Sequence, residues 1–254
     1  MRVIAIHNQK GGTGKTTTTI NLGAALASYG RRTLMIDADS QGHLAEIFRV
    51  KSFPNTMYDI LVLDTVLSSC TVSVRDNLDC IISNATLAAA EIHLSNRGPE
   101  GREMILKRRM MGVTDYDFVL IDCSPSLNLI NQLALVYADE LIIPVSMDYL
   151  ALVGAAQVLE NINILGEEFD NRIELLGVLP TFVDNRKNIT MQTMQTIRRI
   201  YQDRLLSPIR VDSKIESAIA KHRTIFELDP KSKGAEDYMR LCEEIVARGQ
   251  AISR

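Results

Sequence analysis

The sequence lacks several features that mark whole classes of protein. It contains no tryptophan, only 5% aromatic residues and four cysteines among 254 residues. No apolar run approaches the roughly 18 residues that span a membrane, and the chain starts on an apolar, strand-like run rather than on a signal peptide. We therefore expect a cytoplasmic protein with no membrane partner.

The cysteines do not form a ligand pattern. Cys70, Cys80, Cys123 and Cys242 show neither CxxC spacing nor a Cys/His arrangement. Isolated cysteines of this kind are typical of reduced, structural residues. The sequence therefore predicts no iron–sulfur cluster and no cysteine-held metal.

What the chain does contain is an alternation of apolar strand-like runs and helical patterns. Its apolar content of 46% can form one substantial core, and no Pro/Gly-rich linker divides it. We expect one α/β domain over residues 1–254, with a mainly parallel central sheet flanked by helices. The expected strands are 3–6, 32–36, 79–82, 118–121, 140–144 and 174–179, and the expected helices are 16–29, 87–96, 100–111, 127–137, 150–169, 189–203, 213–222 and 235–247.

The strongest local signal lies at residues 8–17, which read Asn-Gln-Lys-Gly-Gly-Thr-Gly-Lys-Thr-Thr between the first strand and the first helix. Gly11, Gly12 and Gly14 have no Cβ and can adopt positive φ values, which turn successive backbone N–H groups toward one anion. The helix N-terminus adds a favourable dipole. This strand–loop–helix context indicates the phosphate loop of a P-loop NTPase.

The residues after the glycines fit ATP with Mg²⁺. We expect Lys15 to reach the β- and γ-phosphates, Thr16 to offer its hydroxyl to Mg²⁺ and Thr17 to bind near the α-phosphate. A second signal is the apolar strand at 118–121, which ends in Asp122. Because parallel strands bring their carboxyl ends to one edge of the sheet, Asp122 should hold the same Mg²⁺ through water.

The loop resembles that of the ParA/MinD group of P-loop ATPases, whose variant loop reads Lys-Gly-Gly-x-Gly-Lys-Thr. Lys10 stands at the group's signature lysine. The resemblance implies that Lys10 acts in catalysis across the interface of a nucleotide-sandwich homodimer, where it contacts the phosphates of the other subunit as an arginine finger would. Residues 84–92, 142–145 and 229–235 also resemble the group, so the similarity covers nearly the whole chain.

Two switch segments are similar to those of the group. The first reads Asp-Ala-Asp-Ser-Gln-Gly and contains Asp37, Asp39 and Gln41. The resemblance implies that Asp39 orients the attacking water and that Asp37 supports the Mg²⁺ and the switch geometry. The second runs from Asp122 to Pro125 and would sense the γ-phosphate.

Three positions depart from the group's pattern. Thr13 in the nucleotide-binding loop replaces the usual valine, Ser40 the usual proline and His43 the usual asparagine. Without proline the backbone φ at Ser40 is less restricted, so the first switch is expected to be looser before ATP binds. The Thr13 hydroxyl can form a hydrogen bond within the loop.

Charge is concentrated late in the chain. Residues 186–223 contain nine Lys or Arg and three acidic residues, although the whole chain has a formal charge of −3. Such a face can neutralise DNA phosphates without reading bases, although charge runs are often only solvated surface. The resemblance places Lys214 at a DNA-binding position. We expect DNA contacts from Arg198, Arg199, Lys214, Lys221 and Arg223.

The same resemblance bears on the base of the nucleotide. It places Arg210 and Asp212 where relatives contact the adenine, and Thr181 beside the base pocket.

These observations favour a ParA-type partition ATPase. It would form a homodimer with ATP, bind double-stranded DNA nonspecifically on the nucleoid and be stimulated by a ParB-like partner on a plasmid, chromosome or other large complex. One alternative is a MinD-like membrane ATPase, although the acidic residues in 235–254 would repel anionic headgroups. A metabolic P-loop enzyme that phosphorylates or amidates a small substrate and a non-hydrolysing nucleotide-gated adaptor are further alternatives.

Overall fold

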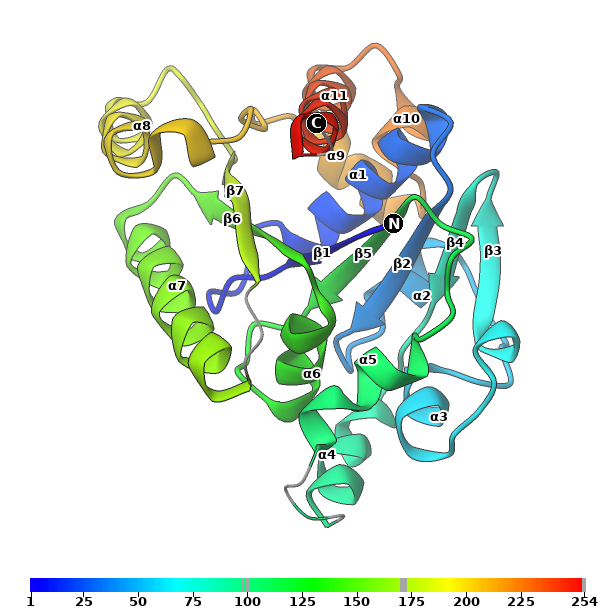
Figure 1. Cartoon of the computed structure of the whole chain (residues 1–254). Coiled ribbons are helices and arrows are strands. Elements are labelled where there is room, and N and C mark those ends of the chain that lie inside the picture. The colour runs from blue at the N-terminus through cyan, green and yellow to red at the C-terminus, as the bar shows by residue number, and fades with distance from the viewer. Residues whose placement is uncertain (97, 99–100, 170–172, 253–254) are drawn as a thin grey trace.

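A seven-stranded sheet in the order β3-β4-β2-β5-β1-β6-β7 forms the middle of the molecule (Figure 1). The computed structural model describes residues 1–96, 98, 101–169 and 173–252. Every neighbouring pair of strands is parallel except β3 and β4, which are antiparallel. The strands are β1 (Arg2–Ile6), β2 (Thr33–Ala38), β3 (Thr71–Arg75), β4 (Leu78–Ile81), β5 (Phe118–Cys123), β6 (Glu140–Ser146) and β7 (Glu174–Thr181).

Helices cover both faces of the sheet (Figure 1). On one face lie α1 (Lys15–Ser28), α2 (His43–Ile47), α9 (Ser213–Ala220), α10 (Ile225–Leu228) and α11 (Lys233–Ile252). On the other lie α3 (Met57–Val62), α4 (Leu87–Ser95), α5 (Ile105–Arg109), α6 (Leu129–Tyr137) and α7 (Tyr149–Phe169), with α8 (Asn188–Tyr201) beside the edge strand β7. Short 3-10 turns occupy Leu67–Ser69, Arg102–Met104 and Gln202–Arg204.

An apolar core fills each space between sheet and helices. The central strands β1, β2 and β5 are almost wholly buried, which is why they read as continuous apolar runs in the sequence. Their inward side chains alternate between the two cores, so that Ile4 packs with α1 and α11 while Val3 and Ala5 pack with α6. Both helical layers are therefore anchored on the same three strands.

The predicted α/β architecture and all six expected strands are present. The sequence analysis missed β3, a five-residue antiparallel edge strand that is only partly buried, although its alternation of polar and apolar residues is a strand signal. It also missed α2, α3 and α10, which have four to six residues and too few turns for a helical period to be recognised.

The expected helix over 100–111 is wrong in its extent. Residue 100 lies outside the described residues, and the remainder divides into the 3-10 turn at Arg102–Met104 and the short helix α5. Gly101 adopts a φ of +65°, and its carbonyl accepts a hydrogen bond from the Arg108 guanidinium. This closed turn replaces the first turn of the expected helix.

The sheet brings the predicted acidic residues to one edge. Asp122 on β5 is in register with Ile6 at the end of β1 and with Asp37 on β2. The phosphate loop follows β1 directly. In the part of the chain that the structure describes, no helix has the length and apolar character needed to cross a membrane.

Candidate nucleotide-binding site

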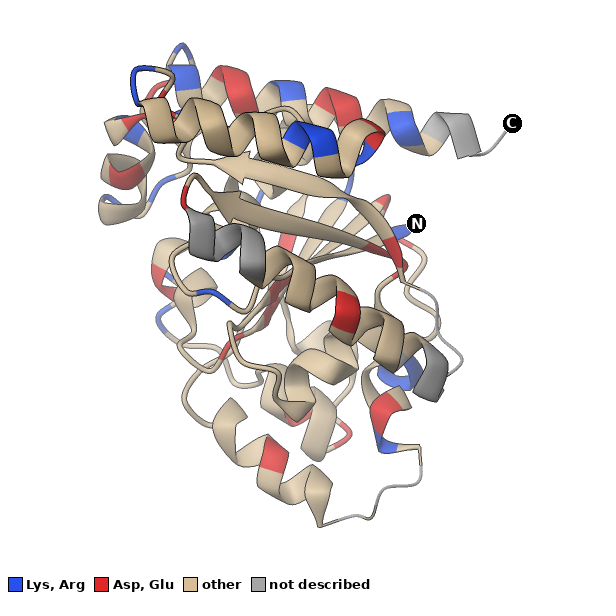
Figure 2. Ribbon diagram, turned by 90° about the vertical axis from the view of Figure 1, so that its left-hand side faces the viewer, with Lys and Arg blue, Asp and Glu red and all other residues tan. Residues whose placement is uncertain are grey.

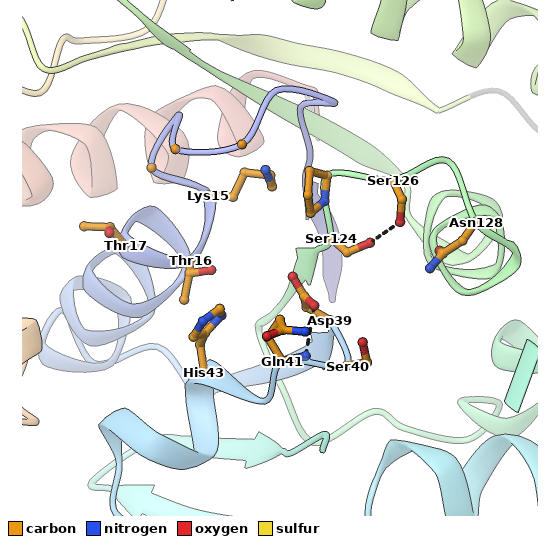
Figure 3. A pocket seen from close by; sticks show the side chains of 14 residues that line it. Lys15, Thr16, Thr17, Asp39, Ser40, Gln41, His43, Ser124, Ser126 and Asn128 are labelled. Carbon is orange, nitrogen blue, oxygen red and sulfur yellow. Dashed lines mark hydrogen bonds between the residues drawn. The ribbon is translucent and has the colours of Figure 1, made fainter. Parts of the chain in front are cut away.

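A cavity of about 530 Å³ opens at this edge of the sheet (Figure 3). Its walls come from the phosphate loop, the first switch after β2 and the second switch after β5. The structure thus brings three segments together that are far apart in the sequence. The lining residues are Gly11, Gly12, Gly14, Lys15, Thr16, Thr17, Asp39, Ser40, Gln41, His43, Ser124, Pro125, Ser126 and Asn128.

The loop has the backbone shape that an anion site requires. Gly12 and Gly14 have φ values of +73° and +89°, a region that side chains with a Cβ rarely adopt. Gly14 caps the N-terminus of α1. The buried Thr13 stabilises the turn from within, because its hydroxyl lies 3.4 Å from the Lys10 carbonyl oxygen and donates to it.

The two lysines of the loop point in different directions. Lys15 is only 8% exposed, and its Nζ donates to the Lys10 carbonyl oxygen at 3.1 Å. Burial lowers the pKa of Lys15, while the charges of Asp122 and Asp39 oppose this shift. Lys10 instead forms an ion pair with Asp148, at the end of β6, and does not line the phosphate cavity.

The residues predicted to hold Mg²⁺ fit a divalent cation. Asp122 is fully buried, and its Oδ1 accepts a hydrogen bond from the Thr19 hydroxyl at 3.3 Å. Its Oδ2 is also buried and has no hydrogen-bond partner among the described residues. Burial raises the pKa of Asp122, and the Thr16 hydroxyl acts in the opposite direction. A carboxylate oxygen left unpaired beside a hydroxyl is a suitable donor set for Mg²⁺, which Thr16 and Asp122 would hold.

In the first switch, Asp37 and Asp39 have different environments. Asp37 is fully buried, and its carboxylate accepts the backbone N–H groups of Asp39 at 3.0 Å and Leu44 at 3.1 Å. Burial, together with the nearby Asp122, raises the pKa of Asp37. Asp39 lies at the cavity surface, and its carboxylate accepts the backbone N–H of Gln41 at 3.0 Å (Figure 3). Asp37 therefore shapes the switch, while Asp39 can reach a molecule in the cavity.

The second switch is held by an asparagine that the sequence analysis missed. Asn131 on α6 accepts the Ser124 backbone N–H at 3.1 Å, and its Nδ2 donates to the Ser124 carbonyl oxygen at 2.8 Å. Asn128 caps α6 by accepting the Asn131 backbone N–H at 3.0 Å. Pro125, which follows Ser124 in this switch, is exposed. The sequence signal that could have located this contact is Asn128, because an asparagine just before an apolar helix is a common N-cap.

A buried histidine beneath the loop was also missed. His7 follows β1, and its side chain is fully buried. Burial lowers its pKa to about 4, and the charge of Lys15 acts in the same direction. Neither ring nitrogen has a hydrogen-bond partner among the described residues. The imidazole is therefore neutral at physiological pH and contributes no charge to the phosphate site.

A smaller cavity of about 130 Å³ adjoins the loop, next to Gly14 and Thr17. It includes the three residues expected at the base, Thr181, Arg210 and Asp212, and also Phe182. The Thr181 hydroxyl donates to the Thr13 carbonyl oxygen at 2.9 Å and so ties β7 to the loop.

The polar groups of two of these base-pocket residues are already engaged. The Arg210 guanidinium donates to Asp237 and Glu236 on α11, at 2.7 and 3.0 Å. Asp212 caps α9 and also accepts the backbone N–H of Gly234 at 2.9 Å. The geometry therefore favours a role for both residues in shaping the pocket.

The residues expected to bind DNA form two groups. Arg198 and Arg199 lie at the end of α8, whereas Lys214 lies on α9, with Lys221 and Arg223 directly after it. All are exposed, and Lys214 forms an ion pair with Asp229. In Figure 2 the described part of α7, across the middle, carries little charge, whereas Lys and Arg mark the helices above it.

Comparison with known proteins defines the class. Residues 1–175 match the family described as AAA domain. The sporulation initiation inhibitor protein Soj of Bacillus subtilis is 37% identical over 253 residues, which cover 98% of this chain and 99% of that protein. The chromosome partitioning protein ParA of Caulobacter vibrioides is 33% identical over 255 residues, covering 98% of this chain and 95% of that protein.

A solved structure agrees with this class. It is the cobyrinic acid a,c-diamide synthase of Mycobacterium smegmatis with bound ADP and magnesium, with a TM-score of 0.82 and 32% identity. It covers 100% of this chain and 97% of that chain. The fold and the phosphate loop define a P-loop ATPase. The chain belongs to the ParA/Soj family of these ATPases.

Proposed function

We propose that this protein is a DNA-partitioning ATPase that ATP and Mg²⁺ convert into a homodimer. The observation that carries the proposal is the position of Lys10. Its side chain lies outside its own phosphate cavity, near the surface, while Lys15 already serves the loop from within. A second lysine so placed can supply positive charge to phosphates bound by another subunit.

Hydrolysis would use the residues that line the cavity. Lys15 and the loop N–H groups hold the β- and γ-phosphates, and Lys10 of the partner subunit neutralises charge on the transferring group. Asp39 orients the attacking water, Thr16 and Asp122 hold Mg²⁺, and Gln41 and Pro125 move with the switches. Because Lys10 of the partner subunit joins these residues only in the dimer, intrinsic turnover is slow, and a ParB-like partner accelerates it.

Nonspecific DNA binding follows from the exposed cations on and after α8 and α9. One subunit offers few phosphate contacts. Pairing of two subunits doubles them, so the affinity rises steeply in the ATP state and falls with salt. The protein would thus associate with the nucleoid and position a plasmid, a chromosome or another large complex.

A second candidate function comes from the similarity to the mycobacterial protein, which is a cobyrinic acid a,c-diamide synthase. ATP-dependent amidation of a small carboxylic acid would use the same phosphate site. It predicts ATP turnover that depends on an ammonia donor and an acceptor. It predicts no dependence on DNA.

The direct test is electrophoretic mobility of a nonspecific DNA duplex with this protein under ATP, ADP or no nucleotide, at two salt concentrations. Retardation with ATP alone, weakened by salt, supports the proposal. Absence of retardation with ATP contradicts it. Flotation with anionic liposomes on the same samples then tests the MinD-like alternative.

A further inference from the structure

The short helix α2 meets the turn that follows α9. His222 Nδ1 lies 3.0 Å from the Glu46 carbonyl oxygen, so the ring N–H can donate to it. This contact brings residues 49–51 beside residues 221–223. Between them is an open cavity of about 420 Å³ whose lining includes Arg49, Lys51 and His222.

Positive charge at this junction is not neutralised. Arg49, Lys51, Lys221 and Arg223 are all exposed, and none forms an ion pair among the described residues. The one acidic residue that lines the cavity is Glu46. The cavity lining thus has two cations, Arg49 and Lys51, against one carboxylate, and Lys221 and Arg223 flank His222 in the chain. This leaves a net positive surface that can bind phosphates.

Other cations nearby differ in this respect. Arg75, which stacks over Phe48 next to α2, forms an ion pair with Glu227. Lys214 on α9 forms an ion pair with Asp229. The net charge at these two side chains is therefore lower than at the four unpaired cations, although ion pairs this exposed contribute only about 0–1 kcal/mol.

The backbone at the junction is also specialised. Arg49 and His222 adopt φ values of +54° and +57°, although neither is glycine. Such values are uncommon for residues with a side chain and cost free energy. Arg49 lies just after α2, and His222 lies just after α9. Both residues line the same cavity.

We propose that Arg49 and Lys51 join Lys221 and Arg223 in one phosphate-binding surface for duplex DNA. This inference rests on the proposed function and extends its DNA-binding face to α2. No sequence motif marked Arg49 or Lys51. They lie 137 and 135 residues before Arg186, the first residue of the basic segment that the sequence singles out.

The surface is physically continuous with the first switch. The backbone N–H of Leu44 on α2 donates to Asp37 at 3.1 Å, and that of Gly42 donates to the Asp39 carbonyl oxygen at 3.1 Å. Arg49 follows this five-residue helix after one intervening residue. Arg49 and Lys51 are thus joined through α2 to the segment that contains Asp37 and Asp39.

The test is a double substitution, Arg49→Gln with Lys51→Gln, which keeps side-chain length and removes both charges. The matched control is Lys107→Gln with Arg108→Gln on α5, on the opposite face of the sheet. Binding of a fluorescent duplex is followed by anisotropy with ATP and Mg²⁺ over a range of salt concentrations. Light scattering on the same samples reports the dimer, and thermal melting reports the fold.

We expect the Arg49/Lys51 variant to lose DNA affinity by at least about tenfold, with a salt slope shallower by about two to four, because a dimer loses four cations. The control should bind as the wild type does. Equal affinity and slope in both variants would overturn the proposed surface while leaving the proposed function intact. A wild-type protein that fails to bind DNA with ATP rejects both, and wild-type binding to phosphatidylglycerol vesicles in place of DNA assigns the surface to lipid and rejects it for DNA.

Discussion

The Nζ atom of Lys10 forms an ion pair with the Asp148 carboxylate of its own subunit. The Ser146 hydroxyl donates to the same carboxylate at 2.7 Å and helps to orient it. The two charged side chains are 32% and 46% exposed, and ion pairs this accessible contribute only about 0–1 kcal/mol. Phosphates on a second subunit can therefore draw Lys10 away from Asp148 at small cost.

Substitution of this lysine should prevent dimerisation. Lys10→Ala leaves Lys15 and the loop glycines in place, so ATP should still bind, but the charge supplied to the partner's phosphates is lost. Light scattering should show a monomer with ATP. The control is Lys187→Ala, which removes a cation that lines, together with Lys10, a separate cavity of about 360 Å³ beside Asp148. A stable ATP dimer of Lys10→Ala would contradict the assigned role.

Removal of the water-orienting carboxylate should trap the dimer. Asp39→Ala should lower ATP turnover by at least about a hundredfold, as is usual for loss of a group that positions the nucleophile. The trapped dimer should still retard DNA. Asp76→Ala, at an exposed turn, is the control. Normal turnover in Asp39→Ala would assign the water to another residue.

Charge reversal on the α9 side should weaken DNA binding without preventing dimerisation. Lys214→Glu with Lys221→Glu replaces two positive charges per subunit by negative ones. We expect the affinity for duplex DNA to fall by at least about a hundredfold at low salt, because phosphate contacts dominate it. The matched control is Lys107→Glu with Arg108→Glu on α5. Unchanged affinity across salt would exclude α9 from the DNA face.

Gly42, the last residue of the first switch, should be required for stability. Gly42 has a φ of +67°, and a Cβ there would lie 2.8 Å from the Ser83 carbonyl oxygen. Gly30 has a φ of +79° with no atom within 4 Å of such a Cβ, so it isolates the backbone cost. We expect Gly30→Ala to lower the free energy of unfolding by about 1–2 kcal/mol and Gly42→Ala by a further 1–3 kcal/mol or so. Urea unfolding measures the free energy of unfolding of both variants. Equal losses would show that the close approach to the Ser83 carbonyl oxygen adds no cost.

The buried His7 should make the protein less stable in mild acid. Its pKa falls from 6.5 to about 4 on folding, so the folded state binds fewer protons than the unfolded state between these values. The contribution of His7 to stability is therefore lost as the pH falls from 6.5 to 4, by about 3 kcal/mol, while the raised pKa values of Asp37 and Asp122 act in the opposite direction.

Replacement of the histidine checks this directly. His7→Leu should remove this contribution, so that the unfolding free energy of the variant falls less on acidification over that range than that of the wild type. His93→Leu, at an exposed position, serves as the control and should keep the slope. If the His7→Leu protein keeps the wild-type slope, another buried group is responsible.

The phosphate loop could be predicted because its signal is local. The glycines of residues 8–17 and the strand before them determine the backbone shape, and Asp122 stands at the end of an apolar strand. The contacts of Lys10 with Asp148 and of His222 with Glu46 could not be predicted in the same way. They join residues 138 and 176 positions apart and depend on how whole layers pack.

The base pocket also combines features that could be predicted with contacts that could not. The resemblance implied that Arg210 and Asp212 contact the adenine, and both line the smaller cavity. It could not indicate that Asp237 on α11 engages the Arg210 guanidinium, because an acidic residue at the surface of a helix usually faces water. Phe182, with a φ of +55°, was missed because its backbone conformation has no sequence signature.

The proposed function requires that the bound nucleotide controls the pairing of two subunits. Sedimentation velocity of the wild-type protein with ATP and Mg²⁺, with ADP and Mg²⁺, and without nucleotide tests it most directly. We predict a species of two subunits with ATP and of one subunit in the other two conditions. The same mass in all three conditions would contradict the account.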